Sequence, residues 1–337
     1  MKVFINKIIP EIGFKLLEEA GIQYTVWKEK PILDRGQAIQ FCKGHDAFLS
    51  VGQAGLDADF FKECKHLKVV ALHSVGFDGV DIKAATANGI PIGNTPNVLN
   101  KATAETALLL MLTVARKALF LHNKIKKGQW GVSQPTQDLG FDLAGKTLGI
   151  VGLGRIGTEL AKICTRSWGM KILYHNRSAN AQAEKEFGAK LVSMDELLTS
   201  SDVVSVHTAL TSETKGMFGM EQFKKMKSSA IFINTARGGV HKEDELIEAL
   251  KKQVIWGAGL DVTNPEPMSK FLTANSIASS KDNSLLEMDN AVVFPHIGSA
   301  TKETRDKMST CAVENIIAGL NGDPLPYPVN PEVQQGR

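Results

Sequence analysis

Short apolar runs alternate with amphipathic segments through the first hundred residues of this 337-residue chain. The apolar runs predict strands, and they lie at residues 3–5, 25–27, 47–51, 69–72 and 90–92. The amphipathic segments predict helices, and they lie at residues 10–20, 33–41, 58–64 and 82–87. Because strands that alternate with helices are joined by right-handed crossovers, we expect this region to form a parallel sheet.

A second alternating pattern begins at Lys146, after a long helix and a glycine-rich loop. The helix is predicted over residues 101–127, and its apolar stretch must be buried against a domain or a partner chain. Residues 128–145 have little periodicity and are interpreted as a connecting loop. The strands predicted after this loop lie at residues 147–151, 171–174, 203–206, 230–233, 254–260 and 291–294. A last helix is predicted over residues 302–320.

Together the two patterns predict an α/β protein with two Rossmann-like or flavodoxin-like parallel-sheet domains and a cleft between them. A length of 337 residues also favours two domains. Since only one helix and a tail follow the second pattern, we expect that helix to fold back on the first domain. The first domain is therefore predicted to be discontinuous, with residues 1–100 plus 301–337, and the second to comprise residues 101–300.

Three glycines with the spacing Gly-x-Gly-x-x-Gly follow the strand predicted at residues 147–151 and precede a helix predicted at residues 156–166. They are Gly152, Gly154 and Gly157. The first permits a tight turn, the second lets the backbone approach a pyrophosphate, and the third allows close helix–strand packing. The helix N-terminus, at Arg155 and Ile156, offers backbone N–H groups to phosphates. The turn predicts that residues 101–300 are an NAD(P)-binding domain, which makes the other domain the substrate-binding one.

The end of the next strand indicates which dinucleotide is expected. An NAD site usually has an acidic residue there, bonded to the ribose 2′-hydroxyl. Here His175 is followed by Asn176, Arg177 and Ser178, with no acid. Arg177 can hold a 2′-phosphate, and Asn176 and Ser178 add hydrogen-bond donors. NADPH is therefore the predicted cofactor, with NADH as the alternative if Arg177 is only a surface arginine.

Arg237, Glu266 and His296 each follow a predicted strand of the second domain. Because the carboxyl ends of parallel strands line one crevice, we expect the three to meet in the cleft, as an active site. Arg237 can grip oxygen atoms through two N–H groups, and His296 can act as a general acid near neutral pH. Glu266 can orient the imidazole and favour its charged form. The three predict reduction of a small 2-oxo acid, whereas His207 is interpreted as a structural or surface histidine.

Composition and charge exclude several other classes of function. The net charge is +3, and no basic run carries interleaved aromatics, so no nucleic-acid partner is expected. The most apolar stretch is too short to span a bilayer, and the N-terminus predicts a strand rather than a signal peptide. The four cysteines lie at neither metal-binding nor redox spacing. We therefore expect a cytoplasmic protein that acts on a small molecule, without a metal or a membrane.

Several stretches resemble the D-isomer-specific 2-hydroxyacid dehydrogenase family, over essentially the whole chain. They are Asn94-Thr-Pro-Asn-Val, Thr103-Ala-Glu-Thr, Thr235-Ala-Arg-Gly-Gly, Gly259-Leu-Asp-Val, Pro265-Glu-Pro, and residues 152–157 and 295–301. Within the family, residues 261–267 and 295–301 and the Tyr-x-x-Arg end of the strand resemble most the glyoxylate/hydroxypyruvate reductases.

The resemblance implies a role for each matching residue. Arg237 matches the substrate-binding arginine, Glu266 the histidine's partner, and His296 the acid/base. Further residues implied to contact the substrate are Val51, Gly52, Val75, Gly76 and Ser299, with Val75 and Gly76 as backbone donors to its carboxylate. Further residues implied to contact the cofactor are Thr235, Ala236 and Asp261, with Asp261 on the nicotinamide carboxamide. The resemblance also implies a homodimer formed through the coenzyme domain, which gives the apolar face of residues 101–127 a partner.

Two features leave alternatives open. Residues 268–283 form a polar insertion, longer than the usual family connection, between Glu266 and His296. Trp130 can either reach the partner's site or pack in the core.

Phosphoglycerate, lactate or phosphite remain alternative substrates. A non-enzymatic scaffold that senses NAD(H), like the family's corepressors, keeps the same three residues, so the sequence does not exclude it.

Overall fold

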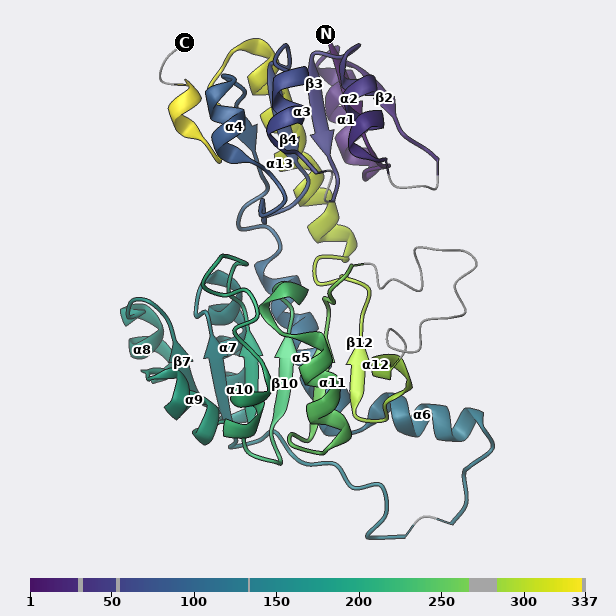
Figure 1. Cartoon of the computed structure of the whole chain (residues 1–337), viewed down its shortest axis with the longest axis vertical. Coiled ribbons are helices and arrows are strands. Elements are labelled where there is room, and N and C mark those ends of the chain that lie inside the picture. Colours follow the sequence, from purple (N-terminus) through teal and green to yellow (C-terminus); the bar gives the residue numbers. More distant parts are fainter. Residues whose placement is uncertain (30–32, 53–54, 133, 267–283, 335–337) are drawn as a thin grey trace. The chain divides into compact units, whose positions relative to one another are not determined.

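The computed structural model describes residues 1–29, 33–52, 55–132, 134–266 and 284–334. Its contacts divide the chain into two units, drawn in Figure 1. Unit 1 comprises Met1–Leu99 and Ala300–Arg337, and unit 2 comprises Asn100–Ser299. Each unit contains one parallel sheet, which confirms the prediction of an α/β protein with two parallel-sheet domains.

Five parallel strands form the sheet of unit 1, in the order β2-β1-β3-β4-β5. The strands are β1 (Lys2–Ile5), β2 (Gln23–Val26), β3 (Ala47–Ser50), β4 (Val69–Leu72) and β5 (Ile92–Gly93). The helices are α1 (Glu11–Glu19), α2 (Arg35–Cys42), α3 (Ala58–Glu63), α4 (Ile82–Ala87), α13 (Lys302–Asn321) and the 3-10 helix η3 (Pro331–Gln334). Helices α2, α3 and α4 each begin at an aspartate whose side chain accepts a backbone N–H of the first turn, which stabilises that end.

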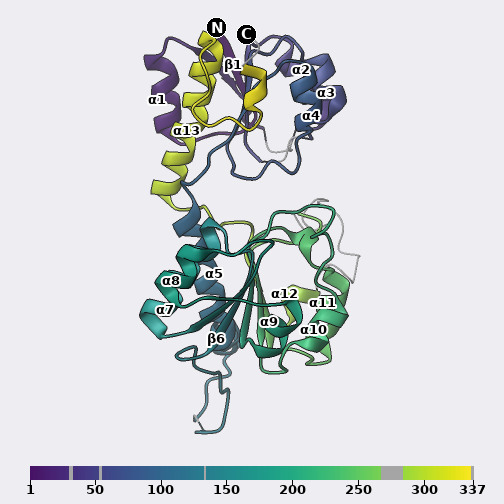
Figure 2. The same cartoon turned by 90° about the vertical axis from the view of Figure 1, so that its left-hand side faces the viewer.

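Apolar side chains cover both faces of this sheet, because successive strand residues point to opposite sides. In β1, Phe4 lies in the core with α2, α3 and α4, whereas Val3 and Ile5 lie in the core with α1 and α13. Figure 2 shows these two helix layers on either side of the strands. Helices cover both faces of the sheet, so ligands are expected at the carboxyl ends of its strands.

The last helix, α13, packs in unit 1 against α1, β3 and β4. Gly319 of α13 lies on Val69 of β4, where a Cβ atom would come within 2.4 Å of the Val69 Cβ. After α13 the chain returns antiparallel beside β5, and Asn94 N donates to Tyr327 O at 3.0 Å. The C-terminal segment therefore supports the loop that follows β5.

Seven parallel strands form the sheet of unit 2, in the order β12-β11-β10-β9-β6-β7-β8. The strands are β6 (Thr147–Val151), β7 (Lys171–His175), β8 (Lys190–Leu191), β9 (Val203–Val206), β10 (Ile231–Asn234), β11 (Gly257–Leu260) and β12 (Ala291–Val293). The helices are α5 (Asn100–Ala115), α6 (Ala118–Lys126), α7 (Arg155–Trp168), α8 (Ala181–Phe187), α9 (Met194–Ser200), α10 (Met220–Lys225), α11 (Glu243–Lys251), α12 (Ser284–Glu287) and the 3-10 helix η1 (Gly238–Val240).

Two hydrophobic cores lie on opposite faces of this second sheet. One core contains residues of α5, α7 and α8, and the other contains residues of α9, α10 and α11. Figure 2 shows the two groups of helices on either side of the strands. Helix α5 packs on β10, β11, β12 and α7, so the apolar face predicted to need burial is buried within unit 2 itself.

The prediction of a single helix over residues 101–127 is wrong. Helices α5 and α6 are separated at Lys117, whose φ of +52° lies in the left-handed region. The carbonyl of Ala115 explains the break, because it accepts the N–H of Phe141 at 3.1 Å from the far end of the connecting loop. An uninterrupted helix would use that carbonyl for the N–H of Leu119. The returning loop therefore takes over the end of α5.

Several strand limits differ from those predicted. Strand β11 begins at Gly257 rather than at residue 254, because the chain is still turning after α11 and Gln253 has a φ of +53°. Strand β8 is only two residues long and was not predicted from the pattern. The predicted insertion at residues 268–283 lies outside the described residues. None of the described helices is long and apolar enough to cross a membrane.

Candidate active site

The three predicted catalytic residues follow three neighbouring strands of unit 2. Strands β10, β11 and β12 are parallel and adjacent, so their carboxyl ends share one edge of the sheet. Arg237 follows β10, Glu266 follows β11 and His296 follows β12. The sheet topology therefore brings residues that are far apart in sequence to one edge.

Glu266 and His296 are in direct contact. Oε1 of Glu266 and Nδ1 of His296 form a hydrogen bond. Both side chains stay accessible, with 33% of Glu266 and 44% of His296 exposed. Because the carboxylate engages Nδ1, it leaves Nε2 of the imidazole to exchange a proton with a ligand.

The loop that carries His296 is held by the buried carboxylate of Asp261. The carboxylate accepts Ile297 N on Oδ1 and Gly298 N on Oδ2, both at 2.7 Å, while His296 N donates to the carbonyl of Asp261 at 2.9 Å. His296 has a φ of +55°, which non-glycine residues adopt rarely. Burial raises the pKa of Asp261, and the two N–H groups and the nearby imidazole oppose that effect. Asp261 therefore fixes the backbone from which the imidazole projects.

Helix α5 supports the same loop from the other side. Thr103 Oγ1 donates to the carbonyl of Gly298 at 3.2 Å. A Cβ atom on Gly298 would lie 2.9 Å from Oδ2 of Asp261 and 3.3 Å from Cγ2 of Thr103. Glycine is therefore required where the loop passes between the strand end and the helix.

A buried amide shapes the turn that carries Arg237. Oδ1 of Asn234 accepts Ala236 N at 2.9 Å, and its Nδ2 donates to Arg237 O at 2.9 Å and to Nδ1 of His241 at 3.0 Å. Because Nδ1 of His241 accepts this hydrogen bond, its ring is neutral with the proton on Nε2. Burial lowers the pKa of His241 to about 4, in agreement with that state. The half-buried guanidinium of Arg237 donates to Ala236 O at 2.7 Å.

The glycine turn has the geometry that its spacing predicts. Gly152 has a φ of +95°, and a Cβ there would lie 2.9 Å from the backbone after β9. A Cβ on Gly157 would lie 2.7 Å from the carbonyl of Gly152. Gly154 is the N-cap of α7, and nothing lies within 4 Å of its Cβ position. No side chain caps this helix, whose first residues are Arg155 and Ile156.

The loop after β7 is joined to this turn through Leu153. Oδ1 of Asn176 accepts Leu153 N at 2.7 Å, and Nδ2 of Asn180 donates to Leu153 O at 3.0 Å. Asn176 therefore braces the glycine turn, while Arg177 and Ser178 are exposed. Of the three residues predicted to bind a 2′-phosphate, these two stand open to a ligand.

A short polar chain connects the ends of β9 and β10 beside the turn. Nδ1 of His207 lies 3.4 Å from Oγ1 of Thr235, and its Nε2 lies 2.9 Å from Oγ of Ser205. Burial lowers the pKa of His207 to about 4, so the ring is neutral at physiological pH. His207 thus positions Thr235, one of the predicted cofactor-binding residues.

These features fit a dinucleotide. The N-terminus of α7 has no side-chain cap, and no atom lies within 4 Å of the Cβ position of Gly154, its N-cap. Such a helix end offers backbone N–H groups and the positive end of the helix dipole to phosphates. The exposed Arg177 lies at the end of the next strand, where the ribose is bound in Rossmann folds.

In unit 1 the predicted substrate-binding residues follow β3 and β4. Val51 N donates to Oδ1 of Asn6 at 2.6 Å, and Gly52 has a φ of +83°. Val75 and Gly76 are half-buried at the end of β4. Since β3 and β4 are adjacent and parallel, the two loops lie at the same edge of that sheet.

Two residues that sequence reasoning did not assign lie at these loops. Nζ of Lys7, just after β1, lies 3.0 Å from where a Cβ atom on Gly52 would be. Nδ2 of Asn94 donates to the carbonyl of Val75 at 2.8 Å. The signal for Lys7 was its place just after the first strand, and that for Asn94 its place in the motif Asn94-Thr-Pro-Asn-Val.

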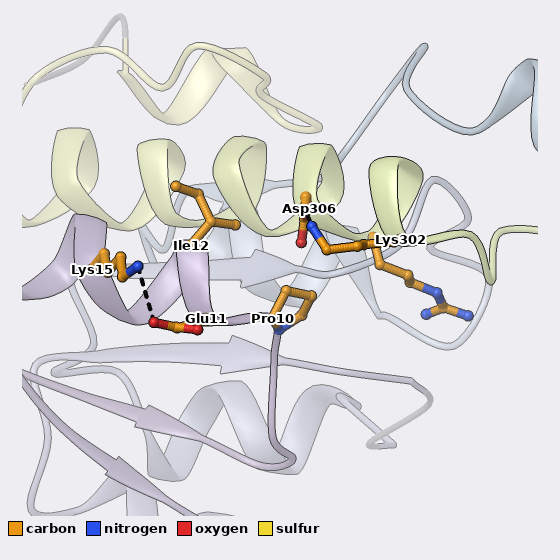
Figure 3. A pocket seen from close by; sticks show the side chains of 7 residues that line it. Pro10, Glu11, Ile12, Lys15, Lys302 and Asp306 are labelled. Atoms are coloured by element: carbon orange, nitrogen blue, oxygen red, sulfur yellow. Dashed lines mark hydrogen bonds and ion pairs between the residues drawn. The ribbon is translucent and has the colours of Figure 1, made fainter.

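A hollow of about 530 Å³ also lies in unit 1, between α1 and the start of α13 (Figure 3). Its charged side chains include two ion pairs, Lys15–Glu11 at 2.9 Å and Lys302–Asp306 at 3.0 Å. Because these charges are already satisfied by neighbours on the same helix, we assign the hollow no ligand.

Comparison with known proteins identifies the family. Residues 108–298 match the family described as D-isomer specific 2-hydroxyacid dehydrogenase, NAD binding domain. The chain belongs to this family. A glyoxylate reductase of Thermococcus litoralis is 40% identical over 336 residues, which cover 98% of this chain and 97% of that protein. The family assignment confirms the resemblance, an enzyme of the 2-hydroxyacid dehydrogenase type, and a nicotinamide cofactor.

Two further similarities agree with this assignment. Glyoxylate/hydroxypyruvate reductase B of Cronobacter sakazakii is 45% identical over 277 residues, or 82% of each chain. The crystal structure of the TT0316 protein of Thermus thermophilus matches with a TM-score of 0.88 and 38% identity, over 98% of this chain and 100% of that one. The family fold thus extends over both units.

Buried neutral histidines predict a loss of stability in mild acid. The pKa values of His73, His207 and His241 are each lowered to about 4, mainly by burial, whereas an unfolded histidine titrates near about 6.5. The unfolded chain therefore binds more protons as pH falls from about 6.5 to about 4, and the free energy of unfolding decreases over that window. Urea denaturation at a series of pH values measures this slope.

The variant His241→Gln keeps an acceptor for Asn234 and removes one titrating group. Between pH 6 and pH 4.5, the slope of its free energy of unfolding against pH should be shallower than that of the wild type. The difference should correspond to about one bound proton. Equal slopes for the two proteins would show that His241 is not held neutral.

Proposed function

We propose that this chain is an NADPH-preferring reductase that converts glyoxylate to glycolate and hydroxypyruvate to D-glycerate. The observation that carries the proposal is the hydrogen-bonded pair of Glu266 and His296 at the sheet edge that Arg237 shares. The names of the relatives from Thermococcus litoralis and Cronobacter sakazakii support the substrates. The scaffold alternative predicts no turnover, so the assays below separate it from an enzyme.

Residues of unit 2 would hold the dinucleotide. The N–H groups at the start of α7 bind the pyrophosphate, with Gly152, Gly154 and Gly157 permitting the close approach. Arg177 and Ser178 bind the 2′-phosphate, and Asn176 holds the glycine turn in place. Thr235, Ala236 and Asp261 line the nicotinamide end.

The proton and the substrate are handled by side chains of this chain. The reduced nicotinamide, when bound, supplies a hydride to C2 of the 2-oxo acid. Arg237 binds the substrate through its carboxylate and carbonyl oxygens. Negative charge develops on the carbonyl oxygen, and His296 donates the Nε2 proton to it as a general acid. Glu266 keeps the imidazole oriented through Nδ1 and stabilises its charged form before the transfer.

Residues of unit 1 bind the substrate carboxylate in this proposal. Val75 and Gly76 donate backbone N–H groups, and the loop at Val51 and Gly52 lies beside them at the same sheet edge. In this proposal the substrates are acids of two or three carbons. Ser299 follows the loop held by Asp261, and its hydroxyl oxygen accepts a hydrogen bond from the hydroxymethyl group of hydroxypyruvate.

A homodimer is part of the proposal. Apolar side chains are exposed along one stretch of unit 2, at Leu109, Leu119, Ile125, Trp130, Val132 and Leu139. Exposed apolar side chains favour contact with another protein, and Trp130, 78% exposed, is not packed in the core of its own chain. The four cysteines are buried thiols, which suits a reducing cytoplasm.

The first prediction tests the acid/base. His296→Ala should lower kcat for glyoxylate by about 10²- to 10⁴-fold, because the proton donor is gone. Glu266→Gln should cause a smaller loss, since the histidine stays but loses its charged partner. NADPH affinity, measured by fluorescence titration, should change little in both variants. A kcat of His296→Ala close to that of the wild type would show that another group supplies the proton.

The second prediction tests the cofactor. The wild type should use NADPH with a higher kcat/KM than NADH. Arg177→Ala should lower kcat/KM for NADPH by about 10- to 100-fold, the value of charge-assisted hydrogen bonds, and leave NADH unaffected. Arg166→Ala is the matched control, because Arg166 is an exposed arginine of unit 2 that pairs with Glu186. A preference for NADH that Arg177→Ala does not change would contradict the proposal.

The third prediction tests the dimer. Sedimentation of the wild type should give about twice the chain mass of 36.6 kDa. Leu119→Asp combined with Ile125→Asp should shift the protein to monomer, because charges would enter the apolar contact. Leu191→Asp, at an exposed leucine of β8, should remain dimeric. A monomeric wild type would refute the dimer.

A further inference from the structure

Three consecutive carbonyl groups of the loop after β4 each accept a hydrogen bond from the protein. Ser74 O accepts Thr95 N at 3.0 Å, and Val75 O accepts Nδ2 of Asn94 at 2.8 Å. Gly76 O accepts Oγ of Ser74 at 2.8 Å. The oxygen atoms that would repel an anion are therefore all engaged by the chain.

The N–H groups of Val75 and Gly76 in this loop differ from these carbonyl groups. Within the part of the chain that the structure describes, neither Val75 N nor Gly76 N donates a hydrogen bond. Both residues are half-buried, so the two N–H groups are partly shielded from water. Backbone N–H groups presented together without their carbonyls are a common arrangement for binding anions.

The planarity of the peptide bond links the two observations. The carbonyl of Val75 and the N–H of Gly76 belong to one planar trans peptide, so they point in opposite directions. When Asn94 holds the carbonyl of Val75, it also fixes the direction of the N–H of Gly76. In the same way, Thr95 N holds the carbonyl of Ser74 and fixes the N–H of Val75. Since Gly76 has no Cβ, its peptide would rotate easily without this support.

Asn94 is itself held rigidly. It is 9% exposed; its N–H donates to Tyr327 O at 3.0 Å, and its carbonyl accepts Nδ2 of the buried Asn315 at 3.0 Å. Oδ1 of Asn315 accepts Tyr327 N at 3.1 Å. A Cβ on Gly93 would lie 2.4 Å from Cγ of Asn315, so only glycine allows this approach. The C-terminal segment therefore fixes the backbone of Asn94, and its side chain extends to the loop.

We propose that Asn94 is a positioning residue for the substrate carboxylate, acting by fixing the Val75–Gly76 peptide so that its N–H group is aimed at the anion. The inference rests on the proposed function, in which Val75 and Gly76 bind that carboxylate. Asn94 does not touch the substrate. Its side chain supports the carbonyl of Val75, and Thr95 adds a backbone support at Ser74 that substitution does not remove.

The experiment compares Asn94→Asp and Asn94→Ala with the control Asn88→Asp. Asp keeps the shape of Asn94 but cannot donate, and Ala removes the donor without adding charge. Asn88 makes a matched bond in unit 1, because its Nδ2 donates to the carbonyl of Ala84 at 2.8 Å. The readouts are KM and kcat for glyoxylate, inhibition by oxalate, NADPH affinity by fluorescence, and Tm.

Both Asn94 variants should raise KM for glyoxylate and the inhibition constant of oxalate by about 10- to 100-fold, because the N–H of Gly76 is no longer aimed at the anion and the loss of one such hydrogen bond has that effect. NADPH affinity should stay within about twofold, because the dinucleotide is bound by unit 2. A residue with only a structural role would lower Tm and leave KM and oxalate inhibition equal to those of Asn88→Asp, which would overturn the inference.

The proposed function fails in a different way. A wild type that turns over neither glyoxylate nor hydroxypyruvate would refute the function. Calorimetric titration with oxalate would then test the loop directly. Binding retained in Asn88→Asp and lost in both Asn94 variants would support the inference, and equal binding in all proteins would overturn it.

Discussion

A single buried carboxylate, that of Asp261, fixes the backbone that carries the imidazole of His296, the proposed acid/base. It accepts two successive N–H groups, those of Ile297 and Gly298, and so holds His296 in a left-handed backbone conformation that the residue would otherwise avoid. Removing that carboxylate would leave both N–H groups without their acceptor at the loop that carries the proposed acid/base. Glu266 engages Nδ1 of the imidazole that projects from this fixed backbone.

Similar supports are found at the other loops of the proposed site, where a side chain binds backbone groups and so fixes the conformation of the loop. Asn234 holds the turn of Arg237, and Asn176 holds the glycine turn at Leu153. In unit 1, Asn94 holds the loop at Val75. Each support is an amide or a carboxylate at the carboxyl end of a parallel strand, where the sheet leaves backbone groups unpaired. The reactive side chains can therefore stay accessible while their backbones are rigid.

Sequence reasoning was most successful where a residue type has a single structural role, such as burial in a strand or a tight turn. Continuous apolar runs such as that of β4 predicted buried strands, and the glycine spacing predicted a turn in which side chains do not fit at Gly152 and Gly157. It failed where a distant partner decides the local structure. The end of α5 depends on Phe141, which the helical period of residues 101–127 does not contain. The support that Asn94 gives to Val75 likewise joins loops after different strands, so no spacing reveals it.

The central claim is the reduction of a small 2-oxo acid to a D-2-hydroxy acid by the chemistry of Arg237, Glu266 and His296. Its most direct test is to incubate the protein with hydroxypyruvate and NADPH and to resolve the glycerate enantiomers by chiral chromatography. The expected result is D-glycerate alone, formed in proportion to the NADPH oxidised. L-glycerate, a racemic product, or no consumption of NADPH would contradict the claim.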